Sequence, residues 1–265
     1  MRFSDLLDAV RRNPLDVSVP PEWAQGRATF GGLVAALQYE ALRAQVPDDR
    51  PLRSLAITFV GPVAPDVSAS YQVEVLREGK AVSQLLGRVV QNAEVMTLVQ
   101  ASFGASRTSE IDVEALPAPP FKHWDECQEL PYIKGVTPEF MRHLAMRWSV
   151  GGLPFTGNKS RDMGGWVRLR GDVKEEPLTE AHILALVDAW PPALLPHLNK
   201  PAPGSTLTWT IEFIQPLQSL STLDWCQYHV EIEHARDGYG HAAAALWGPD
   251  GQLIAISRQT VVVFA

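Results

Sequence analysis

The sequence of 265 residues predicts an α+β fold made of two copies of one unit, each a helix followed by a long antiparallel meander. Three observations point to it. Segments of the second half repeat segments of the first at a nearly constant spacing. Apolar and polar residues alternate with period two along successive stretches of both halves, as in strands with one buried face. A proline-rich, aperiodic stretch lies between the halves.

Two pairs of segments carry the repeat: "REGK" (77–80) with "RDGY" (236–239), and "QNAEVMTLVQASFGA" (91–105) with "DGQLIAISRQTVVVFA" (250–265). In this alignment Arg77/Arg236, Gly79/Gly238 and Gln100/Gln259 are each 159 residues apart, so Gln100 is the expected counterpart of Gln259. Upstream, "TFVGP" (58–62) matches "EFIQP" (212–216) at a spacing of 154 residues.

The same order of elements is predicted in each copy. The first has a short strand near Leu15 to Val19, a helix from about Gly32 to Gln45, and strands at Leu52–Gly61, Val67–Glu78, Lys80–Gln91 and Glu94–Gly104. The hairpin signals are "EGK" and "QNAE". The second has strands near Phe140–Trp148 and Trp166–Arg170, a helix from about Thr179 to Trp190, and strands at 205–215, 222–235, 239–248 and 252–264.

The stretch "EALPAPPFKHWDECQELPY" (114–132) reads as a linker. We therefore expect an N-terminal unit over residues 1–107, a linker over 108–136 and a C-terminal unit over 137–265. Each sheet is expected to curl around its own helix, and the two sheets to join edge to edge or face to face, since either arrangement removes an exposed sheet edge.

Composition excludes several classes of protein. The net charge of −7 and the pI near 5.5 argue against nucleic-acid binding, which needs a basic surface. The two cysteines, Cys127 and Cys226, offer neither a disulfide framework nor a CxxC motif, so we expect a reducing, cytoplasmic location. No stretch reaches the roughly 20 apolar residues that span a bilayer, so no membrane association is expected. The seven histidines form no HxxxH or HExxH pair, and no metal site is expected.

A family resemblance is carried by seven stretches in order: "WAQGRATFGGLVAALQYEAL", "LRSLAITFVGPVAP", "EVLREGK", "QASFGA", "ALVDAWPPAL", "STLTWTIEFIQPL" and "DGQLIAISRQT". Over nearly the whole chain this order resembles the double-hotdog acyl-CoA thioesterases, the acyl-CoA thioesterase II (TesB-like) family. The resemblance implies a tandem (double) hotdog fold, two antiparallel sheets each wrapped around a central helix. It also implies hydrolysis of an acyl-CoA substrate without a metal or organic cofactor. A homodimer or higher homo-oligomer is expected.

The family uses an Asp, a Thr and a Gln of the second unit to orient a water molecule. The resemblance places them at Asp188 in "ALVDAW", Thr206 in "STLTW" and Gln259 in "SRQT". The family often carries an acidic residue two positions after this Thr, where the present chain has Thr208.

Asp188 has the properties of a general base on its own account. At helical spacing it shares the buried face of its helix with Ala181, Leu184 and Ala185. It also lies in the last turn, where the helix dipole disfavours negative charge. Both effects raise the pKa of a carboxyl group. The alternative is a structural Asp that accepts hydrogen bonds from backbone groups of the "WPPALL" turn.

Gln259 and Thr206 are less distinctive. Gln259 shares a strand face with Val261, and either a water and a carboxylate or a neighbouring strand could satisfy its amide. Its counterpart Gln100 leaves open a structural glutamine preserved by the repeat. Thr206 is expected on one strand face with Thr208 and Thr210, where β-propensity alone would explain a threonine.

The first predicted helix begins with Gly31 and Gly32, which we expect to bind substrate. Free N–H groups at such a start stabilise a developing oxyanion, and glycine lets a thioester approach. Close packing of the helix start is the alternative. The carboxylate belongs to the other copy, whose helix start, "PLTEAH", has no glycine. Glu40 is a rival base, but Gln38, Arg43 and Gln45 nearby favour a solvated face.

The sequence thus predicts hydrolysis of an acyl-CoA thioester by water that Asp188 activates. Attack by Asp188 itself, through a mixed anhydride, is the alternative chemistry. A non-catalytic acyl-binding module is the alternative function. A hotdog hydratase would need a motif such as "GDxNPxH", which is missing from the sequence. The sequence assigns neither the acyl chain length nor the residues that bind the CoA phosphates.

Overall fold

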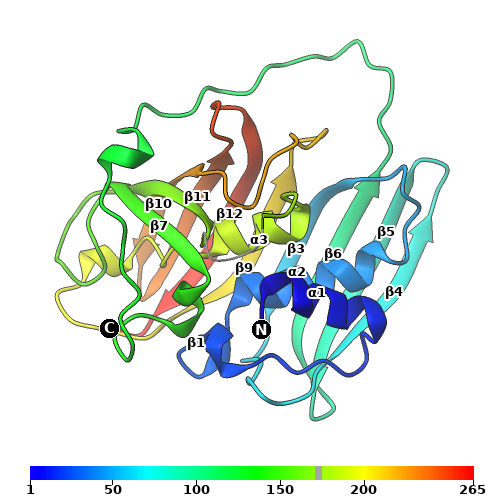
Figure 1. Ribbon diagram of the computed structural model, residues 1–265, viewed down its shortest axis with the longest axis horizontal. Helices are drawn as coiled ribbons and strands as arrows, with labels where there is room; N and C mark the ends of the chain where they lie inside the picture. Colours follow the sequence, from blue (N-terminus) through cyan, green and yellow to red (C-terminus); the bar gives the residue numbers. More distant parts are fainter. Residues whose placement is uncertain (171–174) are drawn as a thin grey trace.

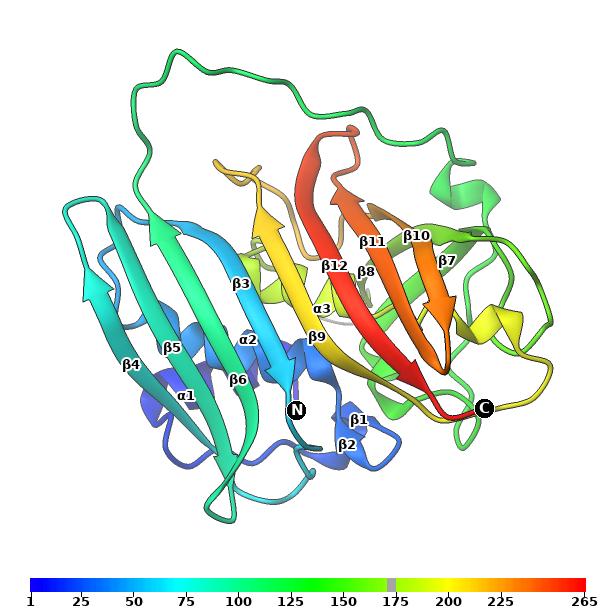
Figure 2. The same ribbon diagram turned by 180° about the vertical axis from the view of Figure 1, so that it is seen from behind.

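The computed structural model describes residues 1–170 and 175–265, and in this part of the chain one large antiparallel sheet is covered by helices on one face (Figure 1). The strand order of its ten strands is β4-β5-β6-β3-β9-β12-β11-β10-β8-β7. The strands are β3 (Leu52–Phe59), β4 (Ser70–Glu78), β5 (Val82–Gln91), β6 (Glu94–Gly104), β7 (Leu144–Val150), β8 (Asp162–Leu169), β9 (Gly204–Phe213), β10 (Cys226–Arg236), β11 (Tyr239–Trp247) and β12 (Leu253–Val263). Seen from behind, the other face of the sheet carries no helix formed by the described residues (Figure 2).

Three α-helices lie on the covered face in the described residues: α1 (Phe3–Arg12), α2 (Gly31–Arg43) and α3 (Glu180–Asp188). A small hairpin of β1 (Ala24–Gln25) and β2 (Ala28–Thr29) leads into α2. Short 3-10 helices are found at Pro21–Trp23, Trp124–Glu126, Glu139–Arg142 and Leu195–His197. None of the helices in residues 1–170 and 175–265 combines the length and apolar character required to span a bilayer.

The two halves of the sheet join edge to edge, which is one of the two arrangements expected. Strand β3 pairs with β9 from Ser54↔Glu212 to Thr58↔Thr208. The result is one continuous sheet and not two separate ones, because the backbone groups of both inner edges hydrogen-bond to each other.

Helices α2 and α3 form the centre of the core. Nearly every residue of α2 from Gly32 to Leu42 is buried, and so are Ala181 to Val187 of α3. A helix that is buried on all sides must pack against other elements in every direction. The two helices pack against each other at the start of α2, where a Cβ on Gly32 would lie 3.0 Å from the carbonyl oxygen of Leu184.

Three elements differ from expectation. Helix α1 was not predicted, although Phe3, Leu6, Leu7 and Val10 have helical spacing and are buried. The expected strand near Leu15 to Val19 forms only an isolated bridge between Val17 and Ala69. The expected strand at Phe140–Trp148 begins as the 3-10 helix Glu139–Arg142, because the chain must turn before it enters β7.

The segment between the two halves has an exposed part and an anchored part. Residues 106–117 are exposed and form no helix or strand. Further along, Leu130 N–H donates to the Met146 carbonyl at 2.8 Å, which covers the edge of β7. The guanidinium of Arg147 lies over the rings of Trp124 and Trp225, 5.4 Å and 5.1 Å from their centroids. The later part of this segment is thus fixed to the second half.

Candidate active site

The start of helix α2 and the last turn of helix α3 meet in the core. Gly31 begins α2 and Asp188 ends α3. A Cβ added to Gly31 would lie 2.9 Å from Oδ2 of Asp188, and one added to Gly32 would lie 3.0 Å from Cβ of Asp188. The glycines of the first half and the carboxylate of the second half therefore belong to one site. Sequence reasoning had predicted both features without bringing them together.

Gln259 holds the carboxylate from the sheet. Its Nε2 donates a hydrogen bond of 3.1 Å to Oδ1 of Asp188. The side chain reaches the carboxylate because Gln259 lies on the core face of β12 together with the buried Val261 and Val263. Period-two alternation predicted this face, and the carboxylate partner was one of the two that the sequence left open.

Thr206 faces the site because of an irregularity in the strand pairing. Thr208 pairs with Thr260, but Thr206 pairs with Val261, so β9 advances by two residues where β12 advances by one. Directly opposed residues point to the same face of a sheet, and Val261 is buried in the core. The bulge therefore turns Thr206 to the core face, whereas alternation alone had placed it with Thr208 on the other face.

Asp188, Gln259, Thr206 and Gly31 all line one pocket of about 420 Å3. Its apolar lining includes Val34, Phe59, Val63, Trp190 and Leu207. A pocket that combines apolar walls with convergent polar groups suits a ligand that combines a hydrocarbon part with one reactive polar group.

Burial raises the pKa of Asp188 to about 7. The hydrogen bond from Gln259 and the backbone N–H of Gly32 act in the opposite direction, because both stabilise the charged form. A carboxyl group with a pKa near neutrality is suited to exchange protons with a substrate or a water molecule.

The counterpart of Gln259 in the first half is not Gln100. Leu55 of β3 corresponds to Trp209 of β9 in the repeat, and these residues pair with Ala101 and Gln259, respectively. Gln100 lies one position away and is exposed on the outer face. The alignment of the repeat was wrong by one residue here, so the repeat gives no support for a structural glutamine at position 259.

Glu40 is not on a solvated face, contrary to the sequence-based expectation. Its side chain is only 6% exposed, and Nε of Arg11 donates to Oε2 at 2.8 Å. The expectation failed because it did not include α1, which covers this face of α2 and supplies Arg11. Glu40 is a paired structural carboxylate and does not line the pocket that contains Asp188.

The start of α3, which corresponds to the start of α2 in the other half, is occupied by a carboxylate and its hydrogen-bond donors. Glu180 begins α3, as Gly31 begins α2, and the hydroxyl of Tyr39 in α2 donates to its Oε2 at 3.1 Å. Nε2 of Gln215 donates to Oε1 of Glu180 at 3.2 Å. A carboxylate with these partners occupies the helix start that is left open by glycine in the other half.

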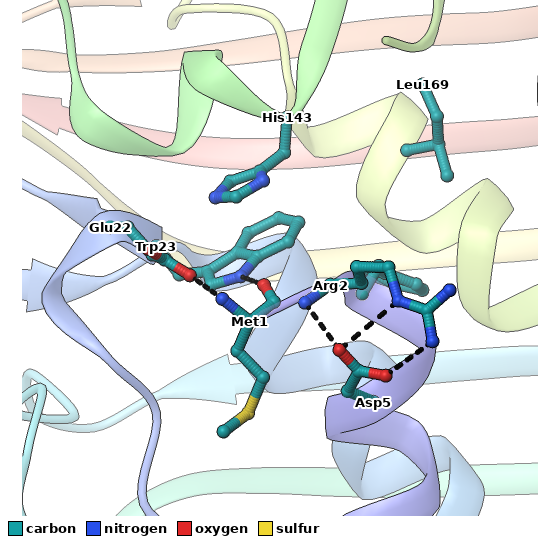
Figure 3. Close-up of a pocket in the computed structure, with 8 residues that line it drawn as sticks. Met1, Arg2, Asp5, Glu22, Trp23, His143 and Leu169 are labelled. Atoms are coloured by element: carbon teal, nitrogen blue, oxygen red, sulfur yellow. Dashed lines mark hydrogen bonds and ion pairs between the residues drawn. The ribbon is translucent and has the colours of Figure 1, made fainter. Parts of the chain in front are cut away.

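A further hollow of about 300 Å3 lies at the start of α1 (Figure 3). Its charged groups are paired with each other: Arg2 with Asp5, and the amino group of Met1 with Glu22. It shares no lining residue with the pocket that contains Asp188. Paired charges leave this hollow little capacity to bind a charged ligand.

Sequence reasoning missed Trp190, which lines the pocket and follows Asp188 by two residues. The signal was available in "DAWPP", where an aromatic residue comes directly after the helix end. Among the described residues, no group of three or more His, Cys, Asp or Glu side chains lies close enough together to hold a metal ion.

The sequence corresponds to a known class of enzymes. A sequence model of the acyl-CoA thioesterase C-terminal domain matches residues 116–263, and one of the N-terminal domain matches residues 19–104. The chain belongs to this acyl-CoA thioesterase family, and as a member it is a thioester hydrolase. It is also 27% identical over 250 residues to acyl-CoA thioesterase 2 of Haemophilus influenzae, a match that covers 88% of this chain and 86% of that protein.

Solved structures show the same fold. A conserved protein of unknown function with a hot dog fold from Alicyclobacillus acidocaldarius superposes with a TM-score of 0.83 at 22% identity, over 94% of this chain and 92% of that one. An acyl-CoA thioesterase II from Mycobacterium marinum superposes with a TM-score of 0.72 at 20% identity, with the same coverage of both chains. The chain thus has a hot dog fold.

Proposed function

We propose that this protein hydrolyses acyl-CoA thioesters by direct attack of a water molecule that Asp188 activates. The observation that carries the proposal is the meeting of the Asp188 carboxylate, the Gln259 amide and the open start of α2 in one pocket. Gln259 donates to Asp188 through Nε2, which leaves its Oε1 to accept a hydrogen bond from the water. The hydroxyl of Thr206 is the second group that positions the water.

The reaction proceeds in two steps. The water oxygen attacks the carbonyl carbon of the thioester while a proton passes from the water to Asp188. The tetrahedral intermediate then breaks its C–S bond, and the proton on Asp188 passes to the departing thiolate. The products are a free acid and CoA.

The start of α2 supplies the positive electrostatic environment for the developing oxyanion. The first intrahelical bond runs from Val34 N–H to the Phe30 carbonyl, so the N–H groups of Gly31, Gly32 and Leu33 have no partner within the helix. The N-cap residue, Phe30, makes no side-chain hydrogen bond to this end of the helix. Gly32 N–H faces Asp188, which leaves Gly31 N–H for the carbonyl oxygen.

The test is thiol release from a panel of acyl-CoA substrates with two to eighteen carbons. We expect release by the wild type and a loss of about 10²- to 10⁴-fold in kcat for Asp188→Asn, which removes the general base. Thr208→Val, on the outer face next to Thr206, is the matched control and should keep full activity. Binding without release on every substrate would replace this proposal by the non-catalytic acyl-binding module.

Attack by water and attack by Asp188 differ in the fate of the solvent oxygen. In a single turnover in H₂¹⁸O, direct attack puts the label only into the product acid. A mixed anhydride that water opens at the enzyme carbonyl would put the label into the side chain of Asp188. Mass spectrometry of the peptide that contains Asp188 distinguishes the two, and label in that peptide would overturn direct attack.

The organisation that we propose is a tandem of two hot dog units, residues 1–107 and 137–265, joined by a linker over 108–136. The packing of α2 against β4, β5 and β6 of the first half, and of α3 against β8 of the second half, supports it. We further propose a cytoplasmic homo-oligomer. Its support is the free, buried state of Cys127 and Cys226 and the helix-free outer face of the sheet (Figure 2). Light scattering measures the oligomeric state.

A further inference from the structure

Three aromatic side chains, Trp148 of β7, Trp190 after α3 and Tyr228 of β10, form a cluster beside the last turn of α3. The ring of Trp190 stacks on that of Tyr228 with centroids 5.0 Å apart and an angle of 9° between the planes. The ring of Trp148 also contacts Trp190, with centroids 5.0 Å apart and an angle of 49° between the planes. Contacts of this kind add to the free energy of burial and fix ring orientation.

Trp190 lies in the same pocket as the Asp188 carboxylate. It follows Asp188 by two residues and lines the same pocket, yet it is only 5% exposed. Its Nε1 is buried without a hydrogen-bond partner in residues 1–170 and 175–265. The polar partners of Asp188 come from α2 and β12. On the aromatic side, Trp190 lines the pocket, and Tyr228 is close enough for the charge of Asp188 to raise its pKa.

The groups that face Asp188 can be named element by element. Helix α2 contributes Gly31 and Gly32, and β12 contributes Gln259, none of which titrates. Strand β10 contributes Tyr228, whose pKa is raised by burial and by the charge of Asp188. Tyr228 is therefore a neutral phenol at any pH at which the enzyme works.

We propose that Trp190 is a positioning residue: its ring, clamped by Trp148 and Tyr228, excludes water from one side of the Asp188 carboxylate and fixes the last turn of α3. The ring does not touch the reacting atoms. It acts through Asp188, because a carboxylate that is denied water on one side is a stronger base and has fewer orientations. The inference rests on the proposed role of Asp188 as the general base.

Two variants and one control test the proposal. Trp190→Ala opens the side of Asp188 to water, and Trp190→Phe keeps a smaller flat ring. The control is Trp247→Ala, because Trp247 of β11 is also buried, at 6% exposure, also has an unpartnered Nε1, and does not line the pocket. Any general effect of losing a buried indole should appear in the control as well.

The first readout is the pH dependence of thiol release. In Trp190→Ala we expect the kinetic pKa to fall from about 7 to below about 6, so that the ratio of kcat at pH 5.5 to kcat at pH 8.5 rises roughly tenfold while the plateau itself falls. Trp190→Phe should shift in the same direction by less. Trp247→Ala should leave the profile unchanged. An unchanged profile in both Trp190 variants, or an equal shift in the control, would overturn the proposal.

The second readout needs no substrate. Carbon-13 NMR of the Asp188 carboxyl, assigned by comparison with Asp188→Asn, gives its pKa in each variant. A pKa that falls in Trp190→Phe, even if Trp190→Ala does not fold, supports the role of the ring. If the wild type releases no thiol from any substrate, the proposed function fails, yet the same titration still decides whether Trp190 controls the carboxyl.

Discussion

The burial of Asp188 has opposite effects on the proposed reaction and on the stability of the fold. Burial raises its pKa from 3.8 to about 7, which is what a general base needs, but the same burial makes the charged form unfavourable in the folded protein. The two polar partners, Gln259 and the backbone of Gly32, offset only part of this cost. Replacing the carboxylate should therefore stabilise the fold while it abolishes the reaction.

This conflict predicts a pH-dependent gain in stability for Asp188→Asn. Between about pH 4 and pH 7 the folded wild type binds one proton more than the unfolded chain, so its stability falls as the pH rises through this window. The accumulated cost reaches at most ~4 kcal/mol above pH 7. Asn carries no charge at any pH. Urea titrations should show a variant more stable than the wild type at pH 8 and a much smaller difference at pH 4.

A side chain at position 31 should impair activity without destabilising the fold. Alanine is a better helix former than glycine, so Gly31→Ala should not weaken α2. Its Cβ would, however, lie 2.9 Å from Oδ2 of Asp188 and 3.2 Å from Cζ of Phe59, and the carboxylate must move away. We expect kcat to fall by about 100-fold with the melting temperature unchanged or higher.

A matched control for Gly31→Ala is Gly204→Ala, in the same pocket. The nearest heavy atom to an added Cβ is there 3.5 Å away, an ordinary contact. Activity should stay within a factor of about two, because nothing is displaced. A similar loss in both variants would contradict the role given to the start of α2.

At the scale of single elements, strand β9 shows where sequence periodicity is sufficient and where it fails. Trp209, Ile211 and Phe213 alternate with polar residues along this strand, and all three are buried. Alternation failed at Thr206, because a bulge lies between Thr206 and Thr208 and no residue type in "STLTW" marks it. Only the family resemblance directed attention to this threonine.

The bulge predicts different results for two neighbouring threonines. Thr206→Val keeps the β-branched shape and removes the hydroxyl that positions the water, so kcat should fall about tenfold, the equivalent of one hydrogen bond. Thr208→Val removes a hydroxyl from the outer face and should leave kcat unchanged. Steady-state kinetics with one acyl-CoA measures both. Equal effects would mean that the bulge does not orient Thr206 as described.

Helix α1 accounts for most of what sequence reasoning missed among the elements. Its buried residues have regular helical spacing, which is the local signal that predicts a helix here. Without α1, Glu40 had no visible partner and was assigned to solvent. Arg11 and Glu40 are 29 positions apart in the sequence, and their pairing depends on the packing of α1 against α2, which no local pattern reports.

At the scale of the whole molecule, the sequence predicted two units but not where they meet. The antiparallel strands could be read from local patterns. The contact between Gly31 and Asp188 could not, because it follows from the pairing of β3 with β9 and the packing of α2 against α3. The β3–β9 pairing and the α2–α3 packing join the two halves, so the sequence pattern of either half alone does not predict them.

One site made by both halves predicts that the covalent linker is dispensable once the protein has folded. Residues 106–117 are exposed and make no strand or helix, so a specific protease site inserted there should be cut in the native state. The cut protein should remain one particle and keep its activity, because β3–β9 pairing holds the halves together. Size-exclusion chromatography with thiol release measures both. Dissociation or loss of activity on cutting would contradict this account.

The closed helix end at Glu180 has a consequence for how such a protein can change over time. If two identical chains associated to build this architecture, the helix starts of both halves would have the same sequence. Every substitution at one helix start would then be present at the other as well. Within a single chain the two clefts can diverge. One has glycine at its helix start, whereas the other has Glu180, which is hydrogen-bonded to Tyr39 and Gln215. Duplication thus lets one cleft specialise in turnover and frees the other to reinforce the scaffold.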